Sequence, residues 1–299
     1  MAFYSKSSQI NLTMRSLYPI VFSVLKFFTD IWKKTGYWRW IYRVPFKIAV
    51  LIASLLFAHY PNPILFLKNI RHLANPEMLI QSDASFLNEV NQEIDQMLPP
   101  NATPLQEFNV VQRYVYRKIP YEFDWNLWGN IDYWPTTQEV WDAKKEDCDG
   151  QSILTVSILR SRGFSSARLV GNIKHVWVEV DQKELMGPLD EKNFQGKKGR
   201  FAIAVPSINL LIDSISFYFR EFPTARIGVL WFLILLLLFH PGKSLFEFIR
   251  LLPFNVAGFL FLLYWAQAEK TITLPFLIGF LLTLFSWILA YIQTKNSYI

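Results

Sequence analysis

The chain of 299 residues is poor in the side chains that most often staple small folds or bind metals. Its single cysteine, Cys148, cannot form a disulfide within the chain, and a lone thiol does not indicate a redox compartment. Of its four histidines, His59, His72 and His240 have no partners at the spacing of zinc ligands. The sequence therefore predicts neither a disulfide framework nor a zinc site.

Charge is missing from long stretches of the second half of the chain. Residues 227–239 include no polar side chain, residues 251–268 are nearly all apolar, and residues 271–292 carry no charge. Hydrophobic residues make up 52% of the chain and aromatic residues 17%, which is too apolar for an ordinary soluble enzyme. Because a membrane span needs about 20 apolar residues, we predict about three C-terminal spans, the first of them short.

A further apolar run predicts an anchor near the N-terminus. Residues 48–58 are apolar, and the run reaches Leu67 only by crossing the proline-containing break at residues 61–63. No cleavage site of small residues follows, so the run is typical of an uncleaved anchor rather than a removable signal. Residues 17–28 predict an amphipathic helix at the membrane surface.

The basic residues predict the orientation. Residues 1–43 hold seven Lys and Arg side chains and one acidic residue, Asp30, so the N-terminus is expected in the cytoplasm. One span then exports the central domain and three return, which puts Lys243 and Lys295 inside and the turn at 269–270 outside. The alternative is a cytoplasmic central domain. Most of the formal net charge of +6 comes from this arm, so the expected partner is the lipid bilayer and not nucleic acid.

The cysteine is the best indication of function. Asp147 can cap a helix that begins at Cys148, Gly150 is small, and the apolar positions of SILTVSIL follow. In the first turn of a helix, free backbone N–H groups and the helix dipole favour a thiolate. His175 comes 27 residues later, at the start of the strand-like sequence HVWVEVD. A thiol, a later histidine and a carboxylate beyond it are the parts of a cysteine nucleophile with its base and orienting acid.

Strand alternation predicts the orienting acid. His175, Trp177 and Glu179 share one face of the strand, and the three valines between and after them form the buried face. If residues 182–183 form a two-residue turn, His175 lies directly opposite Asp190 on the return strand. A carboxylate in that position can fix the tautomer of the histidine and stabilise its charged form.

The residues beside the cysteine oppose a thiolate. Asp147 and Asp149 place two carboxylates next to the sulfur, and like charges disfavour ionisation. An imidazolium, a metal ion or hydrogen bonds that turn the carboxylates away must offset them. Without such a role, Asp147 is a helix cap and Asp149 a solvated charge.

These residues match a family pattern. The sequences NATPLQEFNVVQRYVYRKIPYEFD, WPTTQEVWDAKKEDCDGQSILTVSILRSRGFSSARLVG and HVWVEV resemble the transglutaminase-like superfamily of papain-type thiol enzymes, over residues 75–195. The tract LWGNIDYWPTTQEVW also looks like the bacterial transglutaminase-like cysteine proteinases, whose tryptophan-rich stretch leads into Gly-Asp-Cys-Glu-Asp.

The resemblance implies roles for particular residues. Cys148 would be the nucleophile, His175 the base and Asp190 the orienting acid, acting on a protein or peptide substrate without a required cofactor. Some members of the proteinase group bind calcium beside the cysteine, and Asp147 and Asp149 stand where those ligands would come from. Bound calcium would also remove the electrostatic objection to a thiolate.

The chain departs from the family pattern at three places. Glu146 replaces the usual glycine before Asp-Cys, Val176 replaces the common alanine after the histidine, and the third acid lies in LDEK rather than Leu-Asp-Pro-Thr. The backbone N–H of Cys148 is expected in the oxyanion hole, and the spacing identifies no second donor.

The expected fold class is α+β: a papain- or transglutaminase-like core, with a cysteine-bearing helix on an antiparallel sheet, plus transmembrane helices. Residues 1–74 are the basic arm and anchor, 75–220 the enzyme-like domain and 221–299 the membrane tail. Helices are predicted over residues 76–98 and 103–118, and strands over 166–171, 175–181 and 201–205.

Three functions follow from these residues. The first is a membrane-anchored thiol hydrolase, a protease or amidase, in which water resolves the acyl-enzyme on Cys148. The second passes the same acyl group to an amine, which makes the protein an acyl transferase or cross-linker. The third is a catalytically silent scaffold or binding module in a membrane assembly.

Overall fold

The chain forms two compact units in this computed structural model, which describes residues 23, 26, 30, 34, 38–187, 194–197, 200–203, 205–239, 245–268 and 273–295. The central unit comprises residues 56–227 and 263–273. The helical unit comprises the described residues of 1–55, 228–262 and 274–299.

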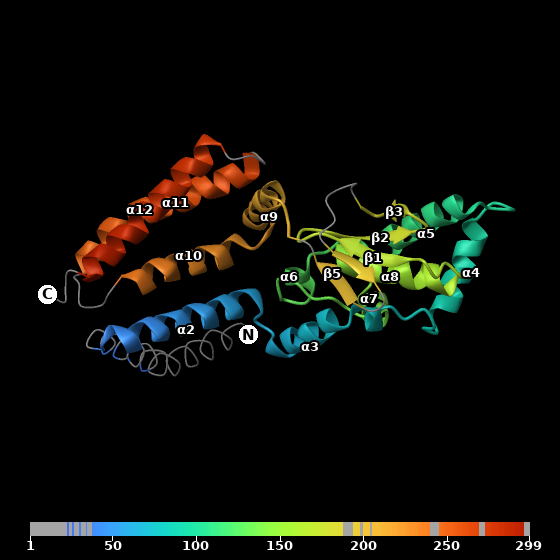
Figure 1. Cartoon of the computed structure of the whole chain (residues 1–299), viewed down its shortest axis with the longest axis horizontal. Coiled ribbons are helices and arrows are strands. Elements are labelled where there is room, and N and C mark those ends of the chain that lie inside the picture. The colour runs from blue at the N-terminus through green and yellow to red at the C-terminus, as the bar shows by residue number, and fades with distance from the viewer. Residues whose placement is uncertain are drawn as a thin grey trace, which may run out of the picture. The chain divides into compact units, whose positions relative to one another are not determined.

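The central unit is built around the helix α8 (Cys148–Ser161), whose residues from Asp149 to Leu159 are all buried. The sheet packs against α8 through β1 and β2, and three other helices also pack against it (Figure 1). The elements around α8 are α4 (Leu87–Met97), α5 (Pro104–Lys118), α7 (Thr137–Ala143), β1 (Arg168–Gly171) and β2 (Val176–Val180). Because α8 is covered on every side, its polar side chains are buried as well, and the hydroxyls of Thr155 and Ser157 donate to the carbonyls four residues earlier in the helix.

Among the described residues the sheet has five antiparallel strands in the order β3-β2-β1-β4-β5. The other strands are β3 (Lys183–Leu185), β4 (Phe194–Lys197) and β5 (Arg200–Ile203). In the centre, Leu169 pairs with Val178 and Gly171 with Val176. The valine face of β2 belongs to the core that includes α8, as the alternation predicts. The expected α+β class is therefore confirmed.

The helix predicted over residues 76–98 is wrong, because the segment forms the short helix η1 (Pro76–Leu79) and then α4. Between them, the Gln81 backbone N–H donates to the hydroxyls of Thr137 (3.1 Å) and Ser157 (3.2 Å). Side chains of α7 and α8 thus satisfy a backbone group that would otherwise require a helical partner. The prediction for residues 103–118 is confirmed, with Thr103 capping α5 in a capping box.

Three helices of the described chain are long and apolar enough to cross a membrane: α2 (Trp40–His59), α11 (Leu245–Ala268) and α12 (Leu274–Lys295). A fourth candidate is the pair α9 (Ile208–Glu221) and α10 (Thr224–Leu238), if the two count as one broken span. The short first span predicted for the C-terminal set falls on α10, whose 15 residues are a candidate only together with α9, across a bend of 110°.

The N-terminal span differs from the prediction in its extent. It runs from Ile41 to His59, so it begins before residue 48 and does not continue toward Leu67. The proline-containing break ends α2, and Asn62 caps the next helix, α3 (Pro63–Ala74), with its side-chain oxygen. Lys47, inside the span, donates to the Leu237 carbonyl (2.5 Å) within the helical unit. Most of the amphipathic helix predicted over residues 17–28 lies outside the described residues.

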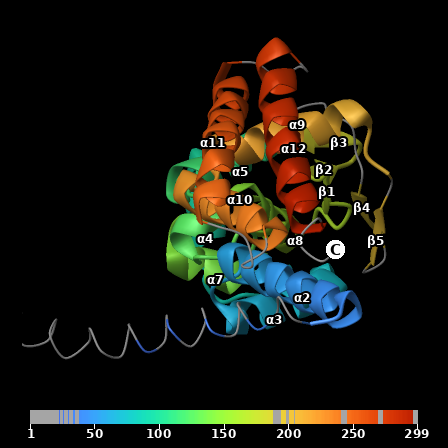
Figure 2. The same cartoon turned by 90° about the vertical axis from the view of Figure 1, so that its left-hand side faces the viewer.

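The helices α11 and α12 run side by side in both views (Figures 1 and 2). Their backbones approach closely at Gly258 and Gly279, where a Cβ atom on Gly258 would lie 2.9 Å from the Gly279 carbonyl oxygen. Small residues at a crossing let transmembrane helices pack backbone to backbone.

Candidate functional site

Cys148 is the first residue of α8 and is half-buried. Asp147 is the N-cap, and its carboxylate accepts from the Asp149 backbone N–H at 3.2 Å. The predicted helix start and cap are therefore confirmed. The first residue of a helix has a backbone N–H without a helical acceptor, as the expected oxyanion donor requires.

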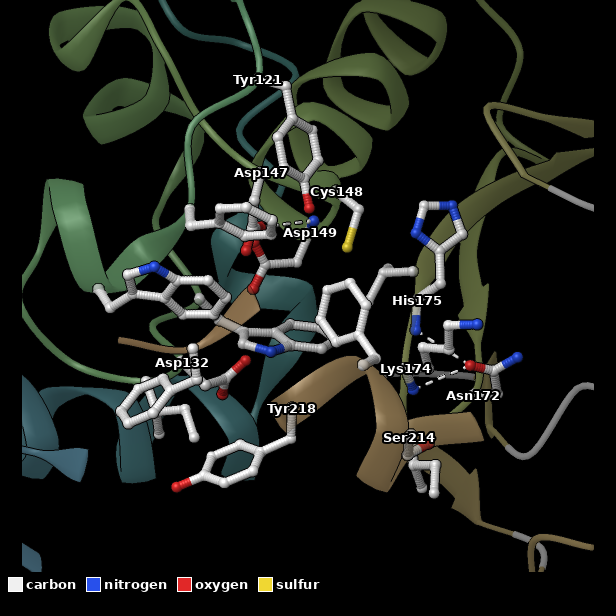
Figure 3. Close-up of a pocket in the computed structure, with 18 of the residues that line it drawn as sticks. Tyr121, Asp132, Asp147, Cys148, Asp149, Asn172, Lys174, His175, Ser214 and Tyr218 are labelled. Atoms are coloured by element: carbon white, nitrogen blue, oxygen red, sulfur yellow. Dashed lines mark hydrogen bonds between the residues drawn. The ribbon is translucent and has the colours of Figure 1, made fainter. Parts of the chain in front are cut away.

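His175 lies at the end of the loop between β1 and β2, next to the cysteine. Asn172 shapes this loop: its side-chain oxygen accepts from the backbone N–H groups of Lys174 (2.9 Å) and His175 (3.0 Å). Cys148 and His175 line the same pocket of 640 Å³, and the imidazole ring faces the Cys148 sulfur (Figure 3). The structure thus brings the two predicted residues together within the central unit.

Two contacts join the start of α8 to β2 directly after the histidine. The Ser152 hydroxyl donates to the Val176 carbonyl at 3.1 Å, and the backbone N–H of Val176 donates to the Cys148 sulfur. The first contact fixes the helix against the strand. Burial raises the pKa of the thiol, and the second contact offsets only part of that increase.

The second ring nitrogen of His175 has an acceptor in the backbone. Nε2 lies 3.0 Å from the Met186 carbonyl oxygen, which fits an Nε2–H donor, so that in the neutral ring Nδ1 is the nitrogen that can accept a proton. Met186 has a φ of +66°, and Gly187 follows, where a Cβ atom would clash with the Trp177 side chain. The Trp177 ring in turn stacks on His175, with ring centroids 5.9 Å apart.

The hairpin register differs from the prediction. The turn is formed by Asp181 (φ +46°) and Gln182 (φ +64°), so that Val180 pairs with Lys183 and Glu179 with Glu184. Two positive φ angles are typical of the type I′ turn, which matches the twist of the strands. The predicted turn at residues 182–183 is therefore wrong, and its register no longer supports a pair of His175 with Asp190. Asp190 lies outside the described residues, so its role stays a prediction.

Four carboxylates gather at the start of α8: Asp124, Glu146, Asp147 and Asp149 each offer an oxygen within 4.8 Å of the others. Two buried oxygens of the cluster, Asp124 Oδ1 and Asp149 Oδ2, have no hydrogen-bond partner among the described residues. Orphaned carboxylate oxygens that converge in this way fit a hard divalent cation such as calcium.

Burial is the main cause of the pKa shifts in this cluster. It raises the pKa of Glu146 to about 8 with help from Asp147, and raises the pKa values of Asp124 and Asp149 well above their usual range. Burial, followed by the charge of Asp147, also raises the pKa of the Cys148 thiol well above its ordinary value. The objection raised from the sequence is therefore larger in the fold, because the carboxylates of Asp124 and Asp132 also raise the pKa of the thiol.

Glu146, the residue that departs from the family pattern, has a defined position. Its carboxylate accepts from the Trp128 indole N–H at 2.5 Å and from the Asp147 backbone N–H at 2.9 Å. A Cβ atom on Gly150 would lie 2.5 Å from the Glu146 Cγ atom, so this carboxylate occupies the space that the glycine leaves. Glycine at position 150 is thus explained by the glutamate at position 146.

The rest of the pocket is mainly aromatic. Eight rings line it: Tyr60, Tyr121, Phe123, Trp125, Trp134, Phe217, Tyr218 and Phe222. The backbone of Tyr121 is held near the cysteine, because it forms an isolated parallel bridge with Glu146, which precedes Cys148 by two residues. Its ring stands beside Cys148 in the pocket (Figure 3). Of the aromatic residues between positions 125 and 134, Trp125 and Trp134 line the pocket.

Comparison with family models, with curated proteins and with solved structures finds no match. Function is therefore inferred from the residues of this pocket.

Sequence reasoning missed Asp124, Tyr121 and the Met186 carbonyl. Asp124 begins the short helix α6 (Asp124–Leu127), and its Oδ2 accepts from the Tyr133 backbone N–H at 2.6 Å. In the sequence, a single aspartate between aromatic residues is a signal for Asp124, whereas a backbone carbonyl such as that of Met186 has no signature.

Proposed function

We propose that the protein is a membrane-anchored, transglutaminase-like thiol hydrolase that acts on amide bonds through an acyl-enzyme on Cys148. One observation carries the proposal: the Cys148 sulfur at the start of α8 faces the His175 ring within one pocket and accepts from the Val176 N–H. A papain-like core is the fold that this helix-and-sheet arrangement favours.

The proposed chemistry uses residues of this chain. His175 takes the thiol proton, and the Cys148 sulfur attacks the carbonyl carbon, forming a C–S bond and an oxyanion. The Cys148 backbone N–H stabilises the oxyanion, and collapse breaks the C–N bond while His175 gives its proton to the leaving amine. Water, deprotonated by His175, then cleaves the thioester and restores the thiol.

Calcium is the proposed cation for the four-carboxylate cluster. Asp124, Glu146, Asp147 and Asp149 would hold it, and a bound divalent charge favours the thiolate form of the neighbouring cysteine. The buried oxygens without partners, Asp124 Oδ1 and Asp149 Oδ2, support this assignment.

The rate at which iodoacetamide alkylates Cys148 tests the proposed pair of Cys148 and His175. Cys148 is the only thiol in the chain, so all alkylation reports on it. With calcium, half-maximal alkylation is expected below about pH 8.5, the ordinary thiol pKa, and a chelator or His175→Asn should move it upward. His72→Asn is the matched control, since His72 is buried and bonded to the Trp134 carbonyl (2.5 Å) outside the pair. An unchanged profile in His175→Asn would leave the catalytically silent scaffold as the better description.

Transfer to an amine is the second candidate, favoured by the aromatic lining of the pocket, which disfavours bulk water near the thioester. Cys148 acylated by p-nitrophenyl acetate should then be released faster by added alkylamine than by water. Release at the same rate with and without the amine would assign the enzyme to the hydrolases.

The proposed topology has four crossings with the central unit outside the cytoplasm. The ends of α2, α10 and α11 at residues 56–59, 224–227 and 263–268 belong to the central unit, as does Thr273 just before α12. One outward and three returning spans would bring these ends to one side. Arg226, a cation on the proposed outer side, donates to the Gly129 carbonyl at 2.9 Å.

Cysteine-accessibility mapping tests the orientation. In a Cys148→Ser background, an impermeant thiol reagent should label Gln112→Cys in intact cells and spare Lys34→Cys in the basic arm. The reverse pattern would invert the orientation, and protection of both sites would place the central unit in the cytoplasm.

A further inference from the structure

Two helices of the central unit carry apolar side chains on their outer surfaces. In α3, Ile64, Leu67 and Ile70 are exposed, and in α9 Ile208, Leu211 and Ile215 are exposed, with exposed fractions between 42 and 77%. We call these six side chains the α3–α9 surface. In each helix the spacing of three or four residues puts the side chains on one stripe.

The helix α3 directly follows the candidate span α2 along the chain, and α9 directly precedes the apolar helix α10. Only residues 60–62 separate the end of α2 from α3, and only residues 222–223 separate α9 from α10. The two junctions are also joined to each other within the central unit: the His59 ring lies 2.8 Å from the Tyr218 hydroxyl and stacks on the Phe222 ring. The start of α3 and the end of α9 are therefore held within a few residues of these apolar helices.

The surface also has the chemistry of an interfacial helix pair. A helix that lies in the interface buries its apolar stripe about 5–10 Å into the headgroup and acyl boundary and keeps polar groups at its edge. Arg71 is exposed beside Ile70, where a guanidinium suits a lipid phosphate. On the other side of α3, Asn69 and His72 are buried in the central unit. Lys68, at the edge of the stripe next to Ile64, is paired with Glu139 at 2.5 Å.

We propose that the α3–α9 surface docks onto the lipid bilayer, so that the central unit lies against the membrane rather than standing away from it. Leu73 of α3 and Ser214, Phe217 and Tyr218 of α9 line the pocket that contains Cys148. The pocket therefore opens next to the lipid surface, and a substrate reaches it from the membrane plane. This inference does not depend on whether Cys148 is catalytic.

Nitroxide accessibility in the full-length protein tests the proposal. In a Cys148→Ser background, Ile64→Cys and Ile208→Cys are spin-labelled in nanodiscs of phosphatidylcholine and phosphatidylglycerol. Apolar oxygen enriches in the bilayer, whereas the polar complex of nickel with ethylenediamine diacetate stays in water. Leu105→Cys is the matched control, because Leu105 is an exposed leucine (52%) at the start of α5. Ile52→Cys, in the span of α2, is the lipid reference.

Labels at positions 64 and 208 should show a higher ratio of oxygen to nickel collisions than the label at 105, approaching that at 52. In detergent-free nanodiscs, nickel accessibility at 64 and 208 equal to that at 105 would show a surface in water and overturn the proposal. Exclusion of both reagents would also overturn it, since protein and not lipid would then cover the surface.

Discussion

The Ser152 hydroxyl donates to the Val176 carbonyl at 3.1 Å, and this buried contact joins the Cys148 helix to the His175 strand. Ser152 lies four residues after the cysteine, and Val176 directly follows the histidine. The hydrogen bond therefore ties the two elements that carry the sulfur and the imidazole, although the Ser152 hydroxyl and the Val176 carbonyl take no part in the proposed chemistry.

Ser152→Ala should slow alkylation of Cys148 at neutral pH, because α8 loses its polar contact with β2. The substitution leaves the buried Val176 carbonyl with one hydrogen-bond partner fewer, which lowers the free energy of unfolding by about 1–3 kcal/mol. Ser157→Ala is the control: Ser157 is a buried serine of the same helix whose hydroxyl bonds to the Ile153 carbonyl and to Thr137. It should lose comparable stability in thermal melts without slowing alkylation. Equal slowing in both variants would mean that the effect is only structural.

Tyr121→Phe should slow acylation by p-nitrophenyl acetate and leave alkylation by iodoacetamide unchanged. We expect the Tyr121 hydroxyl to be the second oxyanion donor, since the bridge to Glu146 holds the ring beside Cys148. Loss of one such donor costs up to about 10²–10³ in rate, and alkylation forms no oxyanion. Tyr264→Phe is the control, because Tyr264 is an exposed tyrosine of α11 that does not line the pocket. Parallel losses in both reactions would count against an oxyanion role.

The carboxylate cluster predicts how stability depends on pH in the absence of calcium. The pKa of Glu146 is about 8 in the folded chain and near 4.5 when unperturbed, so between these values the folded state alone keeps the proton. Stability should therefore be highest below pH 4.5 for this group and fall by up to about 1.4 kcal/mol per pH unit as the pH rises toward 8. Glu146→Gln should flatten the slope, and Asp142→Asn, a change at an exposed carboxylate, should not.

Calcium should reverse that loss, because a bound cation replaces the protons that the cluster otherwise retains. Melting temperatures measured at pH 8 with calcium and with a chelator should differ for the native chain and much less for Asp124→Asn. At a calcium concentration 100 times the dissociation constant, binding adds about 2.7 kcal/mol to the free energy of unfolding. If calcium leaves the melting temperature of the native chain unchanged at pH 8, the proposed cation site is ruled out.

Local chemistry could be predicted from the sequence wherever one residue decides it. Asp147 as a helix cap, Thr103 with its capping box and the buried valine face of β2 all follow from short-range patterns, and the structure confirms them. The two candidate reactive residues, Cys148 and His175, could also be predicted from the sequence, because a cysteine at a helix start and a histidine at a strand start form recognisable patterns.

The predictions that failed concern features that depend on contacts between distant segments of the chain. The turn at Asp181 and Gln182 requires two positive φ angles from residues that are not glycine, which alternation does not reveal. Asp124 reaches the cluster only because α6 folds against the start of α8, and Gln81 breaks a predicted helix because Thr137 and Ser157 offer it hydroxyls. Tertiary partners override local propensity in each case.

Gly258→Val should disrupt the packing of α11 on α12. At this crossing a Cβ atom on Gly258 would lie 2.9 Å from the Gly279 carbonyl oxygen, and the Thr283 side chain is closer still. Gly228→Val is the matched control in the same unit, since a Cβ atom there would meet only Phe259 ring carbons, at 3.8 and 3.9 Å. Thermal melts in detergent should show a lower unfolding temperature for Gly258→Val than for Gly228→Val. The cost of overpacking is typically about 1–3 kcal/mol, and it is larger when backbone must move. If both variants melt alike, the close approach of α11 and α12 does not contribute to stability, and the small-residue crossing loses its physical basis.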